Sequence, residues 1–416
     1  MRRRWAVGSV VFAALVVILT IVALGALSAK PHAESRRTAP PPSNCGTWEN
    51  ATSANLGNQL NFLAGVAALP SGDAWAAGSY VSNGTHLQTL IERNTGGAWS
   101  IVDSPNPSSS SNALYGTAAD STSDAWAVGA SMGTTATQTL IERWDGATWR
   151  VVPSPNDATG DNVLNGVAAV ASNNVWAVGY SGGLGSFGGV PGQALIEHYD
   201  GTGWAVVPNP GSALTNSTLQ AVAASSASDV WAVGNSGGRT RPTSILIEHF
   251  NGTSWSIVLA PNPSPQSTFL LGVAADSASD AWAVGYYETS SATHPLAVHW
   301  DGQYWSLSTT PDGGPSSNAL YSVTATSASD VWAVGQLENP QNVIAGLTEH
   351  WNGATWSLVP SPNPGDAYNL LRGVAAVSAN SVWAIGQQQS RTKSGQQTLV
   401  ERYSVRVSSG TCPQQT

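Results

Sequence analysis

One Trp-centred phrase recurs along this chain at nearly constant spacing. It reads "SDVWAVG" at residues 228–234 and again at 329–335, with close variants elsewhere. Successive tryptophans of the phrase are 50, 51 or 55 residues apart, at Trp75, Trp126, Trp176, Trp231, Trp282, Trp332 and Trp383. Self-similarity at a fixed period means that one structural unit is copied and that neighbouring copies share a core.

Each unit reads as four short strands. In the last copies these are "LLRGVAAVS" at 370–378, "SVWAIG" at 381–386 and "TWSLVPSPNP" at 355–364, and "TLIERWDG" at 139–146 shows the third strand. Val, Ile, Trp and Thr are concentrated in these runs, and turn residues separate them. Asp-Gly or Asn-Gly joins the third and fourth strands in five units, which supplies the positive φ of a tight hairpin. Four-stranded units of about 50 residues are typical of β-propeller blades.

The ends of the repeat predict how the ring closes. A second tryptophan series runs from Trp48 to Trp356, and Trp48 has no earlier strands of its own unit before it. The last unit has three strands and no fourth, so the Trp48 strand completes it. The sequence therefore predicts an all-β, seven-bladed β-propeller of four-stranded blades.

The only two cysteines, Cys45 and Cys412, lie on either side of that predicted seam. A disulfide between them would fasten the ring and stabilise it by about 4–5 kcal/mol on the loop-entropy model. Such a bond also indicates an oxidising compartment.

The N-terminus predicts a membrane anchor. Arg2, Arg3 and Arg4 precede an uncharged run from Trp5 to Ala29, which is long enough to span a bilayer and longer than most signal-peptide cores. We expect an N-terminal transmembrane helix over 1–29, a Pro-rich stalk over 30–44 and the propeller over 45–416. The arginines favour a cytoplasmic N-terminus and a propeller outside the cytoplasm, at the cell surface, or secreted if the segment is cleaved.

Charge limits the partners of the outer part. Charged residues make up only 10% of the chain, and beyond residue 44 there are 24 acidic residues against 10 basic ones. This balance argues against nucleic acid as a partner. The membrane contact is expected through the N-terminal helix alone.

The run "HWNGATWSLVPSPNPGDAYNLLRGVAAVSANSVWAIG" resembles a kelch repeat, of the kind found in the central domain of galactose oxidase. The matching positions are Trp351, Trp356, Val374, Trp383 and Gly386. The resemblance covers residues 45–412 and implies a kelch-like propeller. The second Gly of the kelch pair is replaced, here by Gln387, and the kelch Arg is matched only at Arg372, so the family's binding residues do not carry over.

Residues repeated in every unit are expected to be structural. The tryptophans should fill the space between blades, and "GVAA" should meet the crowded centre of the ring. The third strands carry a repeated Glu followed by Arg or His, interpreted as a strand-surface pair. The Glu series is Glu92, Glu142, Glu197, Glu248, Glu349 and Glu401.

Binding is expected where the repeats differ. One variable residue precedes each innermost "GVAA" segment: Ala64, Tyr115, Asn165, Gln220, Leu271, Tyr321 and Arg372. We expect these residues at exposed strand starts around the mouth of a central channel, on the face that carries the long loops. The polar ones, Tyr115, Asn165, Gln220, Tyr321 and Arg372, are the candidate ligand-binding residues. The loop residues Arg239 and Arg241 are a second candidate region.

No catalytic motif, cofactor motif or metal-ligand spacing occurs in the sequence. The sequence favours a non-catalytic binding module that recognises a glycan or a protein. Two alternatives stay open: a glycoside hydrolase or lyase using acids on the long-loop face, and a structural surface or adhesion protein. The candidate acids are Asp157, Asp161, Glu288 and Asp312.

Overall fold

The computed structural model describes residues 46–405 apart from 58, 82–83, 134, 157–159, 184–191, 239–240, 315–316, 339–342 and 393–394. The described residues all belong to one compact unit, Pro42–Thr416. They form strands and one short 3-10 helix, η2 (Pro210–Ala213). The predicted anchor, the stalk, Cys45 and Cys412 lie outside the described residues. No helix in the described part of the chain is long and apolar enough to cross a membrane.

The strands follow the predicted four-part unit. The first strands are β2 (Asn61–Ala68), β6 (Asn112–Ser121), β10 (Asn162–Ala171), β14 (Thr218–Ser226), β18 (Thr268–Ser277), β22 (Ala319–Ser327) and β26 (Tyr368–Ser378). The second strands, which carry the Trp-centred phrase, are β3 (Asp73–Tyr80), β7 (Asp124–Met132), β11 (Asn174–Ser181), β15 (Asp229–Gly238), β19 (Asp280–Glu288), β23 (Asp330–Glu338) and β27 (Ser381–Gln389).

The remaining strands complete each unit. The third strands are β4 (Gln88–Thr95), β8 (Thr137–Trp144), β12 (Gln193–Tyr199), β16 (Arg241–Phe250), β20 (Thr293–Trp300), β24 (Ile344–Trp351) and β28 (Gln397–Val405). The fourth strands are β5 (Ser100–Val102), β9 (Trp149–Val151), β13 (Trp204–Val206), β17 (Trp255–Ile257), β21 (Trp305–Ser308), β25 (Trp356–Leu358) and, from the start of the chain, β1 (Gly46–Asn50).

These strands pair into antiparallel sheets. Five sheets have four strands each, and the rest form one eight-stranded sheet. That larger sheet is held together at one point only, a parallel pair between Ile344 and Tyr368. On one side of this point are β22 to β25, and on the other are β26, β27, β28 and β1. Because β1 pairs with β28, with Trp48 opposite Tyr403, the Trp48 strand lies where the sequence places it.

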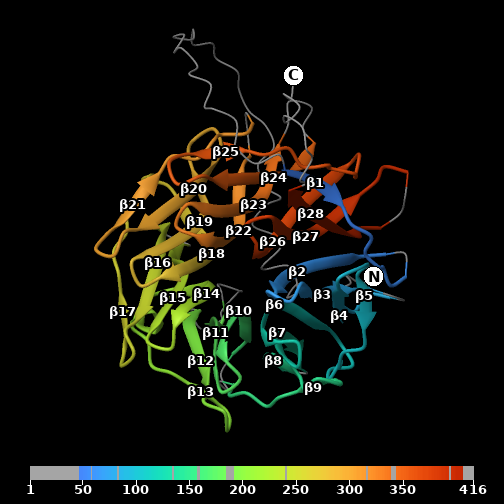
Figure 1. The fold of residues 1–416 in the computed structure, drawn as a ribbon. Helices are drawn as coiled ribbons and strands as arrows, with labels where there is room; N and C mark the ends of the chain where they lie inside the picture. Colours follow the sequence, from blue (N-terminus) through green and yellow to red (C-terminus); the bar gives the residue numbers. More distant parts are fainter. Residues whose placement is uncertain are drawn as a thin grey trace, which may run out of the picture. The chain divides into compact units, whose positions relative to one another are not determined.

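The sheets are arranged around a common centre with their first strands innermost (Figure 1). Each first strand neighbours the first strand of the next sheet, and β26 neighbours β2, so the described strands form a closed ring. Small residues allow this approach. A Cβ built on Gly65, Gly116, Gly166, Gly272 or Gly373 would lie only 2.7–3.2 Å from the backbone of the adjacent first strand.

Both tryptophan series pack between neighbouring sheets, as predicted. A second-strand tryptophan meets the fourth-strand tryptophan of the next four-stranded unit edge to face, with ring centroids 5.1–5.5 Å apart. The pairs are Trp75–Trp149, Trp126–Trp204, Trp176–Trp255, Trp231–Trp305, Trp282–Trp356, Trp332–Trp48 and Trp383–Trp99. Edge-to-face contact is a favoured geometry for aromatic rings, so each pair stabilises the packing of one unit against the next.

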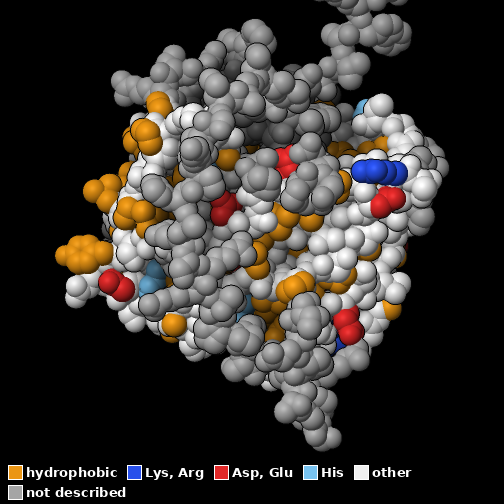
Figure 2. Space-filling model, turned by 90° about the horizontal axis from the view of Figure 1, so that it is seen from above, with side chains coloured by type: hydrophobic (Ala, Val, Ile, Leu, Met, Phe, Trp, Pro, Cys, Tyr) orange, Lys and Arg blue, Asp and Glu red, His pale blue; other side chains and the backbone are white. Residues whose placement is uncertain are grey.

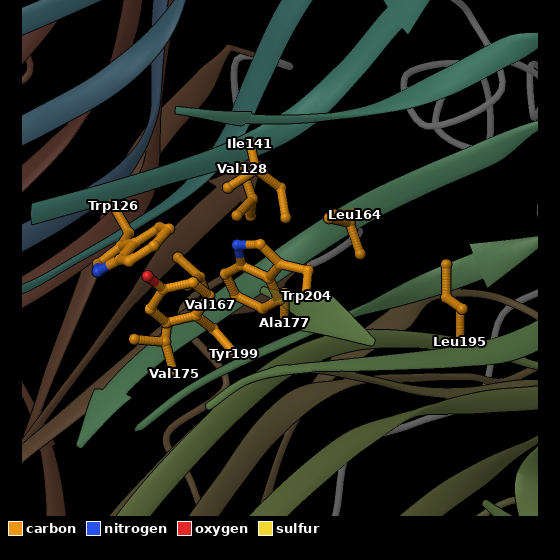
Figure 3. Close-up of a cluster of buried hydrophobic side chains, with 10 residues drawn as sticks. All are labelled: Trp126, Val128, Ile141, Leu164, Val167, Val175, Ala177, Leu195, Tyr199 and Trp204. Carbon is orange, nitrogen blue, oxygen red and sulfur yellow. The ribbon is translucent and has the colours of Figure 1, made fainter. Parts of the chain in front are cut away.

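Figure 3 shows one of these shared cores. Trp126 comes from β7, whereas Leu164, Tyr199 and Trp204 come from the next sheet. The rings of Trp126 and Tyr199 are 4.9 Å apart. The hydrophobic core of this protein therefore lies mainly between sheets, and no single sheet has a core of its own.

The phrase "SDVWAVG" is explained by three contacts. The His or Arg opposite the Trp stacks on its ring, with His centroids at 4.1–4.3 Å and Arg Cζ atoms at 4.7–5.1 Å. The Asp of the phrase forms a hydrogen bond with that same His or Arg side chain, as between Asp229 and His249 at 2.6 Å. The closing Gly faces the first strand: a Cβ on Gly234 would lie 2.0 Å from the Thr218 carbonyl oxygen.

The repeated glutamates correct the sequence interpretation, which put them on strand surfaces. All six are 0% exposed, with their carboxyl groups enclosed between sheets. Glu401 accepts hydrogen bonds from Ser361 Oγ at 2.7 and 3.0 Å, and Glu92 does so from Ser53 Oγ. Because both serines lie in the crossing from the preceding sheet, these carboxyl groups fasten one sheet to the next. A repeated, isolated charge on a strand looks like a surface residue in sequence, and only the neighbouring sheet reveals its burial.

The loops divide between two faces as predicted. The short turns between first and second strands touch the hairpins, since a Cβ on Gly252 would lie 2.8 Å from the Ser228 Cβ. On the other face, the crossings between sheets meet the ends of the second strands. There the Glu288 amide donates to the Ser267 carbonyl at 2.8 Å, and the Met132 amide to the Ser111 carbonyl at 2.8 Å. We call this second face the long-loop face.

Candidate functional site

The variable residues lie at irregular points of the first strands. In each first strand the pairing with the second strand skips one residue, and the skipped residue is the variable one. These β-bulge residues are Ala64, Tyr115, Asn165, Gln220, Leu271, Tyr321 and Arg372. A bulge leaves its extra residue unpaired and re-aims its side chain, and bulges are common next to functional sites.

This placement corrects the expectation that these residues stand at exposed strand starts. They lie inside the first strands, and all are half-buried. The bulge is imposed by packing against the neighbouring unit, because the small residue that follows it must meet the next first strand closely while the Leu before it stays in the core. Packing therefore fixes the backbone position of each bulge, whereas the bulge side chain can differ from unit to unit.

Contacts between bulge residues follow the ring. Asn165 Nδ2 donates to the Leu219 carbonyl of the adjacent first strand at 2.8 Å. Arg372 lies with its Cζ 5.8 Å from the centroid of the Tyr321 ring. Since these contacts join first strands of neighbouring sheets, the side chains occupy the inner part of the ring.

Three further aromatic residues join this region, and the sequence analysis missed them. Tyr180 and Tyr286 directly follow the Gly of the repeated phrase, and Tyr368 begins β26. In other units the position after that Gly holds Ser, Ala, Asn or Gln, so its variability was the available signal. Tyr286 stacks on Phe269 with ring centroids 4.7 Å apart.

Geometry and electrostatics link four of these side chains. Arg372 lies over the Tyr321 ring and shares β26 with Tyr368. Burial raises the pKa of Tyr286, and the Tyr321 and Glu288 charges raise it further. Burial raises the pKa of Tyr321 and of Tyr368, whereas the Arg372 charge lowers both. We call Tyr286, Tyr321, Tyr368 and Arg372 the Tyr–Arg arc.

A second aromatic group lies around Tyr115. Burial raises the pKa of Tyr115 to about 12. The pKa of Tyr180 is also raised, first by burial and then by the charges of Tyr115 and Asp161. The predicted residues are thus divided: Tyr321 and Arg372 lie together, Tyr115 and Asn165 lie elsewhere on the ring, and Gln220 lies on β14.

The guanidinium of Arg372 lacks a carboxylate partner among the described residues. Its Nε is buried and makes no hydrogen bond there, and its charge meets only the Tyr321 ring. Arg93 and Arg143, in contrast, each pair with an Asp and also stack on a Trp. A half-buried guanidinium without a carboxylate is unusual, because a buried charge is costly unless it is paired.

The candidate acids do not form a catalytic pair in the described structure. Asp312 accepts from Asn318 Nδ2 at 2.6 Å and contacts His294 Nδ1 at 2.9 Å, while Asp161 accepts from the Thr137 amide. Both therefore hold loops in place. Asp157 and Arg239 lie outside the described residues, and Arg241 begins β16 without a described side chain. Within the described ranges no three His, Cys, Asp or Glu residues are grouped as metal ligands.

Comparison with known proteins identifies the fold class and no more. No family model matches the chain, and no curated protein matches it. The solved structure of YCF48 bound to D1 peptide aligns with 88% of this chain and 98% of its own at 11% identity and a TM-score of 0.53. A protein of unknown function from Dyadobacter fermentans DSM 18053 aligns with 86% and 99% at 10% identity and a TM-score of 0.50.

A third similar structure is the GH74 xyloglucanase from Xanthomonas campestris. The alignment covers 83% of this chain and 54% of the xyloglucanase chain, at 12% identity and a TM-score of 0.47. The ring of antiparallel sheets and the first two structures show an all-β, propeller-type fold. At 10–11% identity they show the fold alone, which does not choose between binding and catalysis.

Proposed function

We propose that this chain is a non-catalytic binding module whose ligand, a glycan or a protein, is held by the bulge residues at the centre of the long-loop face. The observation that carries the proposal is the contrast at the bulges. Residues on both sides of each bulge repeat from sheet to sheet, yet the bulge residue itself changes from Ala64 to Tyr115 to Arg372. A position that is central, half-buried and free to vary suits recognition better than it suits packing.

Binding is favoured over hydrolysis by the state of the acids. A glycosidase needs two carboxyl groups that converge on one bond. Asp161 and Asp312 each hold a loop by hydrogen bonds, and the buried glutamates are dispersed around the ring between sheets. The hydrolase or lyase and the purely structural surface protein remain the alternatives that an experiment must separate.

We expect the triple change of Tyr115, Tyr321 and Arg372 to Ala to abolish binding to a glycan or peptide array, which we would use first to find a ligand. The side chains are half-buried at bulges, so the variant should keep its β content and lose little stability. Wild-type binding by the variant would contradict the proposal. Catalytic turnover of a captured glycan by the wild type would instead favour the enzyme.

The proposal extends to the architecture around this site. We propose seven blades, the eight-stranded sheet being two blades that touch at Ile344 and Tyr368, with a kelch-like repeat. We also propose a membrane anchor over residues 1–29, which puts the propeller outside the cytoplasm at the cell surface. A low-charge surface agrees with this: charged side chains are sparse on the face that Figure 2 shows.

A disulfide between Cys45 and Cys412 belongs to the same proposal. It is supported by the strands next to the two cysteines, because β1 starts at Gly46 and pairs with β28, which ends at Val405. Non-reducing peptide mapping of exported protein should recover the linked pair, and Cys45→Ser should lower the melting temperature without loss of β content. Two free thiols in oxidised, exported protein would disprove the bond.

A further inference from the structure

We propose that the Tyr–Arg arc binds the carboxylate of an acidic sugar, such as a uronic acid residue within a polysaccharide. The inference rests on the proposed function and adds the chemistry of the ligand. It starts from Arg372, whose Nε is buried without a hydrogen bond among the described residues. A carboxylate is the group that a guanidinium matches best, with two parallel hydrogen bonds.

The tyrosines indicate what the rest of the ligand is, beyond its carboxylate. The Tyr321 ring lies 5.8 Å from the Arg372 guanidinium carbon, and the charge of Arg372 also reaches Tyr368. No hydrogen bond of the Tyr286 or Tyr321 hydroxyl is formed among the described residues, and both residues are half-buried. They are free to exchange hydrogen bonds with a ligand. A sugar ring presents flat C–H faces for the aromatic rings and hydroxyl groups for the phenols, and a uronic acid adds the carboxylate.

Glu288 limits the position of the acid group. Glu288 ends β19, two residues after Tyr286, and its charge raises the pKa of Tyr286. Glu288 is therefore at the Tyr286 end of the arc. A ligand with its carboxylate at Arg372 and its neutral hydroxyls toward Tyr286 avoids like-charge repulsion.

The backbone around the arc argues against a peptide strand as the occupant. Peptides that bind at a sheet use an unpaired strand edge. Here β22 and β26 each pair with their second strand on the outer side, and the Val374 amide already donates to Ser322 Oγ across the inner side at 3.2 Å. Recognition by side chains alone, as in sugar binding, fits this arrangement better.

The test compares the binding of an acidic oligosaccharide with that of its uncharged methyl ester. The full-length chain in detergent would be titrated calorimetrically with oligogalacturonate and with the methyl ester of the same oligomer; glucuronate and mannuronate oligomers would widen the panel. We expect at least one acid oligomer to bind about tenfold or more tightly than its ester, with the preference weakening as salt rises.

Variants then assign the preference to the arc. Arg372→Gln should remove it, Arg372→Lys should keep only part of it, and Arg150→Gln, at an arginine of β9 whose side chain is 72% exposed, should leave it unchanged. Equal affinity for acid and ester, no uronate binding at all, or full preference in Arg372→Gln would each overturn the inference. If acid and ester bind equally and the triple variant binds neither, the proposed function stands although this inference fails. If only a peptide carboxylate binds, and its binding depends on Arg372, the ligand is a peptide and not a sugar.

Discussion

Trp231→Ala should destabilise the protein by about 3–5 kcal/mol, the cost of removing a large buried aromatic side chain. Trp231 is 0% exposed. Its ring meets Trp305 at 5.1 Å and Trp300 at 5.0 Å, both in the next sheet, and His249 stacks on it at 4.1 Å. The substitution removes the aromatic contact between two sheets at once, so the ring should unfold at lower denaturant concentration.

The measurement is urea unfolding followed by Trp fluorescence and far-ultraviolet circular dichroism. The matched control is Tyr304→Ala in the hairpin beside Trp305, because Tyr304 is 72% exposed and should change stability by less than about 0.5 kcal/mol. Equal losses in the two variants would mean that the packing between sheets does not carry the stability that its geometry suggests.

The sequence was sufficient for the parts of the fold that repeat. Period and strand pattern agree in every unit, turn chemistry agrees in five, and the structure shows the expected positive φ at Gly146, Gly201, Gly252, Gly302 and Gly353. The out-of-phase Trp48 predicted the pairing of the first and last strands. Such predictions succeed because each is made several times over, so that an error in one unit is visible against the others.

What failed depends on contacts between units. Whether Glu142 is buried is decided by the neighbouring sheet, and a single unit contains no sign of it. The bulge at Tyr321 arises because the next residue, Ser322, must fit against the adjacent first strands, β18 and β26. The sequence of one unit alone does not reveal this constraint. Tyr286 and Tyr368 were missed as site residues for the same reason: they are far apart in sequence and are brought together only when the first strands form the ring.

The buried glutamates lead to the second large expected effect, a loss of stability as pH rises. Burial raises the pKa of Glu142 and of Glu197 to about 8, and that of Glu92, Glu248 and Glu401 to about 7. Burial also holds the pKa of Glu349 well above its usual value. The folded protein therefore keeps these carboxyl groups protonated at pH values where the unfolded chain has already released the protons.

The sign follows from that difference. Below the ordinary glutamate pKa of 4.5 the groups are protonated in both states, so they do not make the free energy of unfolding depend on pH. As pH rises toward 7 and 8, ionisation favours the unfolded chain, and each pKa unit of difference corresponds to about 1.4 kcal/mol. The free energy of unfolding should thus fall between about pH 5 and pH 9, by several kcal/mol for the group as a whole.

Glu142→Gln isolates one member of the series. The chain itself shows that a neutral side chain is tolerated at this position, because β20 carries the fully buried Val298 in place of the glutamate. We expect Glu142→Gln to be within about 1 kcal/mol of the wild type at pH 5 and more stable than it by roughly 1–4 kcal/mol at pH 9. Urea unfolding at both pH values measures the difference, with the exposed, non-titrating Gln303→Ala as the control whose stability relative to the wild type should be the same at both pH values. A wild type whose stability rises from pH 5 to pH 9, or a Glu142→Gln variant that parallels it throughout, would mean that these carboxyl groups are ionised in the folded protein and that water or unrecognised donors reach them between the sheets.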